Sequence, residues 1–203
     1  MSYRGLILDF GGVVTTDFYG ALSAFCVRQG LAHDAFVRVL RDTDEGRRAL
    51  AAVESGKITQ QAYEKTIADL LGVDSKGLLG RALADLRPRP EVLELVRRVR
   101  AGGIVVGVLS NSWGSGDYDP YNGYDLEDNF DAVVISDQVG LRKPDPAIYL
   151  RTATSMGLPA NECIFVDDTA ANLPAAAELG MAVVHFADTA AGIQKIERLL
   201  DAA

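Results

Sequence analysis

Apolar residues gather in five short runs along the chain, and polar residues follow most of them directly. Each run is too short for a stand-alone helix, which is typical of a strand buried on both faces of a parallel sheet. With their closing residues, the predicted strands are Leu6 to Asp9, Ile104 to Asn111, Ala132 to Ser136, Cys163 to Asp168 and Ala182 to Phe186.

Helical patterns separate these strands in the second half of the chain. Pro90 suits the first turn of one helix, and Gly102 and Gly103 end it. Further helices are expected from Asp145 or Pro146 to Met156, from Ala171 to Leu179, and around Ile193 to Leu200. Strands that alternate with helices need right-handed crossovers, so the pattern predicts an α/β fold with a Rossmann-like, doubly wound parallel sheet.

The segment from Phe18 to Leu86 differs, because no strand pattern interrupts it. Its apolar spacing predicts a succession of helices, the first beginning at Thr16 or Asp17 and ending near Gly30. The sequence RPRP at 87–90 marks the return to alternating strands and helices. We therefore expect an α/β core of residues 1–15 and 88–203, with an inserted helical domain of residues 16–87.

One segment, Trp113 to Phe130, fits neither pattern. It is rich in Gly, Asp, Asn and Tyr, which is typical of a solvated acidic loop. Because it follows the polar end of the second strand, a loop that faces a substrate or a dimer partner is the alternative. Its acids do not follow the spacing of a calcium-binding loop.

Composition and charge exclude several kinds of partner. The formal net charge is -8, from 28 acidic residues against 20 Lys and Arg. Such a surface repels nucleic acid and anionic membranes, so we expect neither as a partner. No apolar run is long enough to span a bilayer. Cys26 and Cys163 lie in apolar sequence, which favours buried free thiols and a cytoplasmic protein. We expect a monomer or a weak homodimer.

Candidate functional residues lie where the predicted strands end. Asp9 ends the first strand, Ser110 and Asn111 end the second, and Asp167 and Asp168 end the fourth. Since the carboxyl ends of such strands border the ligand crevice, these side chains are expected to converge. Each alone has a plain structural explanation, such as a strand-end turn or a helix N-cap. Their joint occurrence in one fold order favours a functional site.

The charges at this edge suggest what it binds. Three carboxylates close together repel one another, and a divalent cation, usually Mg²⁺, together with Lys143 would resolve that conflict. The Ser110 hydroxyl and the Lys143 ammonium suit phosphoryl oxygens. Gly11 and Gly12 allow backbone amides to approach an anion closely. The stretch LILDFGGVV, taken alone, fits a strand that ends in a solvated turn equally well.

In their order, these motifs resemble the haloacid dehalogenase-like (HAD) hydrolase superfamily. The resemblance rests on Asp9, on Ser110 and Asn111, on Lys143 before Pro-Asp-Pro, and on FVDDTAANLPAAAELGM at 165–181. It covers almost the whole chain, and residues 16–87 are similar to the family's small helical cap. The first and last motifs look closest to the phosphatase-like branch that includes the N-terminal domains of mammalian epoxide hydrolases. A phosphatase of small phosphorylated metabolites is therefore implied.

The resemblance also implies residue roles. Asp9 would be the nucleophile, would form an aspartyl-phosphate, and would bind Mg²⁺ together with the Gly11 carbonyl and Asp168. Asp167 would be a direct or water-mediated ligand, and Lys143 would pair with Asp9. The remaining expected roles are binding of the phosphoryl group and substrate by Ser110, Asn111, Gly11 and Gly12, and positioning behind the site by Asn172.

Position 11 departs from the family's phosphatases, which usually carry a second Asp two residues after the nucleophile. That residue protonates the leaving group and activates water, and general acid–base catalysis is worth roughly 10²- to 10⁴-fold. Three explanations for Gly11 stay open. The substrate has a good leaving group, as in anomeric or aryl phosphates; a cap residue or Thr15 supplies the proton; or the chain is a weak enzyme retained for binding.

Two other functions are alternatives. A metal-independent 2-haloacid dehalogenase also uses an Asp nucleophile and also lacks the second Asp. Such enzymes commonly carry Tyr at position 11 and neutral groups in place of Asp167 and Asp168, so the paired acids favour the phosphatase. A non-catalytic ligand-binding protein is the other alternative. Specificity is expected from the cap, where Arg41, Arg47 and Arg48 are candidates to meet an anionic leaving group.

Overall fold

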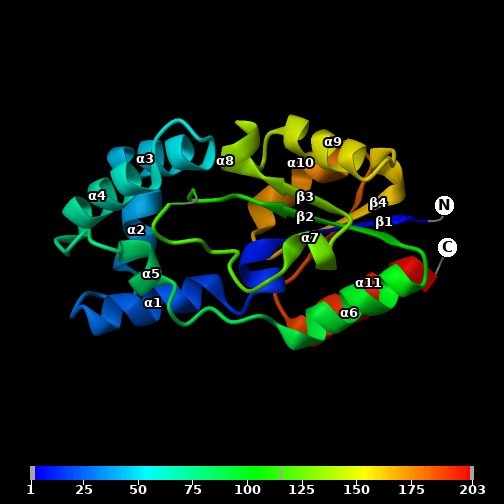
Figure 1. Cartoon of the computed structure of the whole chain (residues 1–203), viewed down its shortest axis with the longest axis horizontal. Coiled ribbons are helices and arrows are strands. Elements are labelled where there is room, and N and C mark those ends of the chain that lie inside the picture. The colour runs from blue at the N-terminus through cyan, green and yellow to red at the C-terminus, as the bar shows by residue number, and fades with distance from the viewer. Residues whose placement is uncertain (1–2, 115, 202–203) are drawn as a thin grey trace.

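A parallel sheet forms the centre of the molecule. The computed structural model describes residues 3–114 and 116–201. Five parallel strands lie in the order β3-β2-β1-β4-β5 (Figure 1). They are β1 (Gly5–Asp9), β2 (Val105–Ser110), β3 (Ala132–Ile135), β4 (Cys163–Asp167) and β5 (Ala182–His185). All five predicted strands are present in this sheet, so the predicted α/β fold class is confirmed.

Strand β1 lies in the middle and determines where the strand ends meet. Every β1 residue is buried, as expected for an apolar run covered on both faces. Leu8 pairs with Val108 of β2 on one side and with Val166 of β4 on the other. Because the strands are parallel and in this register, the polar residues that follow them emerge at the same edge of the sheet.

Helices cover both faces of the sheet. On one face, α6 (Pro90–Ala101) and α11 (Thr189–Asp201) lie side by side, and α9 (Pro146–Ser155) and α10 (Leu173–Glu178) cover the other (Figure 1). Two short helices, α7 (Leu126–Asn129) and α8 (Ser136–Val139), flank β3 and were not expected from the sequence. Within the described ranges, every helix is too short or too polar to cross a membrane.

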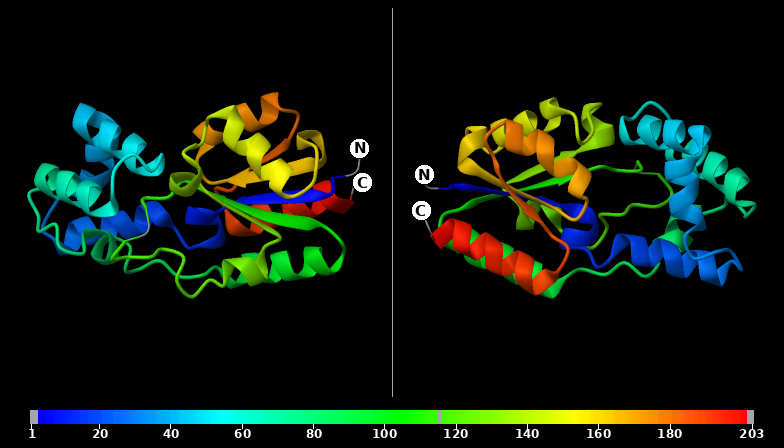
Figure 2. Two further views of the ribbon diagram at one scale, coloured as in Figure 1. Left: turned by 45° about the horizontal axis from the view of Figure 1, so that its top comes forward. Right: turned by 180° about the vertical axis from the view of Figure 1, so that it is seen from behind.

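Five helices form the cap, which lies beyond the carboxyl edge of the sheet, away from both chain ends (Figure 2). They are α1 (Phe18–Arg28), α2 (Ala35–Asp42), α3 (Asp44–Glu54), α4 (Gln60–Leu71) and α5 (Leu78–Ala82). Side chains of Asp17, Thr43 and Thr59 cap α1, α3 and α4. The predicted helical block is present, although α5 ends before Leu86 and the chain continues as a turn towards Pro88.

Two linkers join the cap to the core. Thr15 and Pro88 form an antiparallel bridge, and the amide of Thr16 donates to the carbonyl of Arg87 at 2.8 Å. The Arg89 amide likewise donates to the Val14 carbonyl at 2.9 Å. The chain thus leaves and re-enters the core at one place. The domain boundaries expected at 15/16 and 87/88 stay a prediction, and they fall at these linkers.

Trp113 belongs to the core, but its side chain packs among the helices of the cap. It belongs to the loop after β2, yet it is buried in the apolar cluster of the cap helices. Its ring stacks on Phe36 with centroids 5.9 Å apart and meets Phe18 edge-on at 5.1 Å. The segment from Trp113 to Phe130 is therefore not a uniformly solvated loop. Its acids are exposed as expected. Its first residue, Trp113, instead packs a core loop against the cap.

Candidate active site

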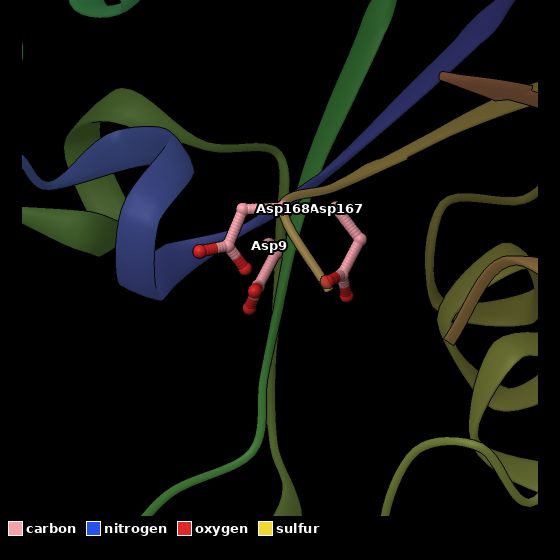
Figure 3. Close-up of side chains that lie close together, drawn as sticks. All are labelled: Asp9, Asp167 and Asp168. Atoms are coloured by element: carbon pink, nitrogen blue, oxygen red, sulfur yellow. The ribbon is translucent and has the colours of Figure 1, made fainter. Parts of the chain in front are cut away.

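Three carboxylates meet at the carboxyl edge of the sheet. Asp9 ends β1, Asp167 ends β4, and Asp168 follows directly. Each offers an oxygen within 4.8 Å of the others, and the side chains project into the same space (Figure 3). Asp167 is fully buried and Asp9 is 8% exposed. The structure thus brings together the three acids that the sequence singled out.

Lys143 compensates part of this charge. Its Nζ lies 2.7 Å from Asp9 Oδ1 and 2.7 Å from Asp167 Oδ2, and its side chain is 1% exposed. Burial alone would lower the pKa of Lys143, but Asp9 and Asp167 together raise it above its ordinary value. Burial and the neighbouring acids raise the pKa of Asp9 well above its usual range, and Lys143 opposes this shift. One ammonium among three carboxylates leaves room for a further cation.

Asn111 holds the backbone of Lys143. The Lys143 amide donates to Asn111 Oδ1 at 2.9 Å, and Asn111 Nδ2 donates to the Lys143 carbonyl at 3.1 Å. Asn111 also lines the cleft above the acids. The side chain expected to bind substrate therefore makes its hydrogen bonds within the protein, where it fixes the place of the lysine.

Asn172 and Thr169 hold Asp167 in place. Asn172 Nδ2 donates to Asp167 Oδ2 at 3.0 Å, and the Thr169 amide donates to Asp167 Oδ1 at 2.8 Å. Since Lys143 also donates to Oδ2, both oxygens of this buried carboxylate are engaged. Asn172 thus lies where a positioning residue was expected. Asp168 is less enclosed, and burial followed by repulsion from Asp167 raises its pKa to about 6.

The turn after β1 brings the backbone close to the acids. Gly12 has a φ of 78°, and a Cβ there would lie 2.1 Å from Asp168 Oδ2, so a side chain at this position would displace that carboxylate. The Gly12 amide donates to Thr15 Oγ1 at 2.9 Å. It is therefore already satisfied within the turn. Gly11 differs: its φ is -69°, and a Cβ there would meet the Phe18 ring at an ordinary 3.5 Å.

Ser110 lies at the end of β2 and is 4% exposed. Its Oγ accepts a hydrogen bond of 2.9 Å from the hydroxyl of Tyr121. That bond leaves the Ser110 proton available for a group placed above the sheet edge. Burial raises the pKa of Tyr121 far above its ordinary value, so this phenol stays a donor.

A cleft of about 430 Å³ opens above these residues, between core and cap. Its floor includes Asp9, Lys143 and Asp168, and its walls come largely from cap side chains. One wall holds Glu54 at the end of α3, whose Oε2 lies 2.6 Å from Arg142 Nε. Burial raises the pKa of Glu54, and Arg142 opposes that shift.

Sequence reasoning missed several residues around the site, and for some of them the reason is that they contact parts of the chain far away in sequence. Glu54 reaches Arg142, and Trp113 reaches the cap cluster. No motif marks them. The residues concerned are Glu54, Trp113, Tyr121, Arg142 and Thr169.

The chain matches a family model described as haloacid dehalogenase-like hydrolase over residues 3–180. The match covers most of the chain and includes every residue of the site described above. The protein therefore belongs to the HAD-like hydrolase family and is a hydrolase.

Among curated relatives, the chain is 24% identical to bifunctional epoxide hydrolase 2 of Sus scrofa, over 98% of this chain and 39% of that protein. It therefore spans well under half of that relative's length. The chain is also 29% identical to D-ribitol-5-phosphate phosphatase of Bacteroides thetaiotaomicron, over 87% of this chain and 88% of that protein.

Solved structures show the same fold. A HAD family enzyme of Bacteroides thetaiotaomicron, in complex with magnesium and inorganic phosphate, matches with a TM-score of 0.69 at 23% identity, over 91% of this chain and 94% of that one. A dehalogenase with an intermediate complex matches with a TM-score of 0.72 at 20% identity, over 98% and 97%. At these identities the likeness establishes the fold, and the chemistry has to be argued from the site.

Proposed function

We propose that the protein is a Mg²⁺-dependent phosphatase of small phosphorylated metabolites that acts through an aspartyl-phosphate on Asp9. The observation that carries this proposal is the arrangement in which Lys143 bridges Asp9 and Asp167 while Asp168 faces the same space. A dehalogenase needs no metal, and three carboxylates against one ammonium would serve it poorly. The relative that acts on D-ribitol 5-phosphate supports the same choice.

Asp9 is arranged for attack through one oxygen. Its Oδ1 accepts from the Phe10 amide at 2.7 Å and contacts Lys143 Nζ at 2.7 Å, which leaves Oδ2 for the phosphorus. Lys143 favours the ionised carboxylate and so opposes the rise in the pKa of Asp9 that burial and the neighbouring acids cause. The Ser110 hydroxyl and the Lys143 ammonium would bind the phosphoryl oxygens, whose negative charge spreads in the transition state.

The reaction would proceed in two displacements. First, Asp9 Oδ2 forms a bond to phosphorus while the bond to the leaving oxygen breaks, and that oxygen keeps the electron pair. Then water adds to phosphorus, the bond to Asp9 breaks, and the carboxylate is regenerated. The protons of the water pass to phosphate and solvent.

The donor set fits Mg²⁺, because it consists of hard oxygen ligands. Asp9, Asp168 and the Gly11 carbonyl would hold the ion. Asp167, whose oxygens are engaged by Lys143, Asn172 and Thr169, would act by orienting Lys143 or through a water. When bound, the ion would supply positive charge that reduces repulsion between the carboxylate nucleophile and the phosphoryl group.

The test is phosphate release from p-nitrophenyl phosphate and acetyl phosphate, with Mg²⁺ and with EDTA. We expect turnover only with Mg²⁺, and a loss of about 10³-fold or more in Asp9→Asn, which keeps the size of the side chain but not its nucleophilic charge. Metal-independent halide release from a 2-haloacid, without phosphate release, would overturn the proposal in favour of a dehalogenase. Binding without turnover of any of these substrates would overturn it in favour of a ligand-binding protein.

A further inference from the structure

Apolar side chains from the cap face the cleft above the acids. Val37, Leu40 and Leu50 lie on α2 and α3, where each remains partly accessible and also lines the cleft. Phe18 of α1 and Trp113 of the core also line it. These five residues, the apolar wall, surround the space into which a group leaving from a phosphate above Asp9 would extend.

We propose that the substrate is an aryl phosphate monoester, whose aromatic leaving group packs against the apolar wall. This inference rests on the proposed phosphatase function and specifies its substrate class. It makes Leu40 and Leu50 residues that determine specificity without taking part in bond making.

The shape of the cleft suits a ring system. Its volume of about 430 Å³ lies within the usual range of small-molecule sites, roughly 300–1,000 Å³. The Phe18 and Trp113 rings meet edge-on, with centroids 5.1 Å apart and planes inclined by 77°. Because both rings also line the cleft, their accessible edges offer apolar contact to an aromatic leaving group.

The cap offers apolar contact more readily than ionic contact. Arg41 and Arg47 line the cleft, but Arg41 Nε lies 2.8 Å from Asp42 Oδ1, and Arg47 is paired with Asp44. Their charges are thus already matched by neighbours on the same elements. This arrangement disfavours a leaving group that carries its own negative charge.

The site also lacks a carboxyl group to protonate the leaving oxygen. Gly11 occupies the position of the family's acid, and among the described residues that line the cleft the carboxyls are Asp9, Glu54 and Asp168. Asp9 and Asp168 are assigned to attack and metal binding. Glu54 Oε2 lies 2.6 Å from Arg142 Nε and accepts from Asn111 Nδ2, so both contacts use this oxygen within the protein and as an acceptor.

With glycine in place of the family's acid, a leaving group that can depart as an anion is favoured. A phenol ionises with a pKa of about 10, as in tyrosine, whereas the pKa of an alkyl alcohol, like that of water, is far higher. The bond from phosphorus to an aryl oxygen therefore breaks with its electron pair on a phenolate, which needs no proton from the protein. The apolar wall and Gly11 thus favour the same class of substrate for independent reasons.

The test compares three substrates: 1-naphthyl phosphate, acetyl phosphate and glycerol 3-phosphate. Acetyl phosphate has a good leaving group but no ring, so its hydrolysis reports on the chemistry alone. We expect kcat/KM to be highest for 1-naphthyl phosphate and lowest for glycerol 3-phosphate. In Leu50→Asn, kcat/KM for 1-naphthyl phosphate should fall about tenfold, and that for acetyl phosphate less than about threefold.

Val27→Asn is the matched control, because Val27 is a cap residue on α1 that is 62% exposed and does not line the cleft. It should leave all three values unchanged. Two outcomes would overturn this inference but leave the proposed function intact. One is that Leu50→Asn lowers kcat/KM equally for 1-naphthyl phosphate and acetyl phosphate. The other is that glycerol 3-phosphate is hydrolysed as efficiently as 1-naphthyl phosphate. Failure to hydrolyse acetyl phosphate in a Mg²⁺- and Asp9-dependent way would overturn the proposed function, and the inference with it.

Discussion

Gly11 occupies the position at which hydrolysis of a phosphate with a poor leaving group would require a general acid. A Cβ at this position would meet Phe18 at 3.5 Å, and the backbone φ of -69° suits any residue. The backbone would therefore accept an acid at this position. Beside an aromatic ring, a carboxyl would be partly desolvated, which favours its protonated form.

We predict that Gly11→Asp increases turnover of glycerol 3-phosphate by about tenfold or more, because a general acid then reaches the leaving oxygen. Turnover of 1-naphthyl phosphate should change much less, since a phenolate leaves without a proton. The measurement is kcat for both substrates. Gly11→Asn, which has nearly the same size but no titratable proton, is the control and should give no gain. A similar gain with both substrates would contradict this explanation.

Asp168 illustrates the cost of holding unmatched charge for function. Its folded-state pKa of about 6 is raised above the ordinary value of 3.8, mainly by burial. The folded state therefore binds protons more readily than the unfolded state. Without metal, stability is greatest below the ordinary pKa and is lost as the pH rises through about 6.

We predict that metal-free Asp168→Asn is more stable than the unchanged protein by about 1–3 kcal/mol at neutral pH. The difference should shrink as the pH falls towards 4. Urea unfolding at several pH values measures it. Excess Mg²⁺ should stabilise the unchanged protein and leave the variant unaffected. A variant that is less stable at neutral pH would show that this carboxylate is not strained, and a variant that Mg²⁺ stabilises as much as the unchanged protein would show that it is not a ligand.

At the level of elements, the end of α3 contacts residues that hold the loop of Lys143. Glu54, the last residue of α3, lies 2.6 Å from Arg142 and 3.4 Å from Asn111 Nδ2. Asn111 in turn bonds both backbone groups of Lys143. Helix α3 of the cap therefore contacts Arg142 and Asn111, which both adjoin Lys143. A shift of the cap is expected to displace Lys143.

We predict that Glu54→Gln lowers the free energy of unfolding by about 1–3 kcal/mol, because the partly buried Arg142 loses its partner and this loss outweighs the relief of a carboxylate whose pKa is raised by burial. The kcat should fall more than KM rises, since Lys143 is displaced and not the binding wall. The double variant Glu54→Gln/Arg142→Met removes both charges and should recover part of the lost stability. Additive losses in this cycle would show that the two residues do not interact.

The elements that were predictable are those that a local pattern determines. The apolar run of Leu6 to Leu8 and its four counterparts form strands because burial on both faces demands continuous apolar sequence. Asp9 and Asp167 converge because parallel strands share an edge. The short helix α8 and the early end of α5 were not predicted, because such brief elements carry too little periodicity.

The contacts between cap and core were beyond prediction for a different reason. Gln60 donates to the carbonyls of Gly114 and Tyr118 at 2.7 and 2.8 Å, more than fifty residues away in sequence. Trp113 stacks on Phe36 across a similar separation. Such contacts depend on how two compact units pack against each other. Nothing in the local sequence around either partner specifies that placement.

At the scale of the whole molecule, these contacts link cap and core, and we expect the two to unfold as one cooperative unit. Trp113, the single tryptophan of the chain, belongs to the core loop but lies 9% exposed within the cap cluster. Its removal would leave a hole in the cap and free the loop that follows β2. A cap anchored in this way is poorly suited to swing open as a rigid lid, so we expect a substrate to enter through the mouth of the cleft.

We predict that tryptophan emission and far-UV circular dichroism report the same urea midpoint, because Trp113 cannot become solvated until cap and core separate. Trp113→Ala should lower stability by about 3–5 kcal/mol and split the dichroism transition in two, as the cap loses its anchor. Trp113→Phe, which keeps an aromatic ring, should retain a single transition. An emission shift that precedes the loss of helix in the unchanged protein would instead identify the cap as a unit that detaches by itself, and would require a hinged lid.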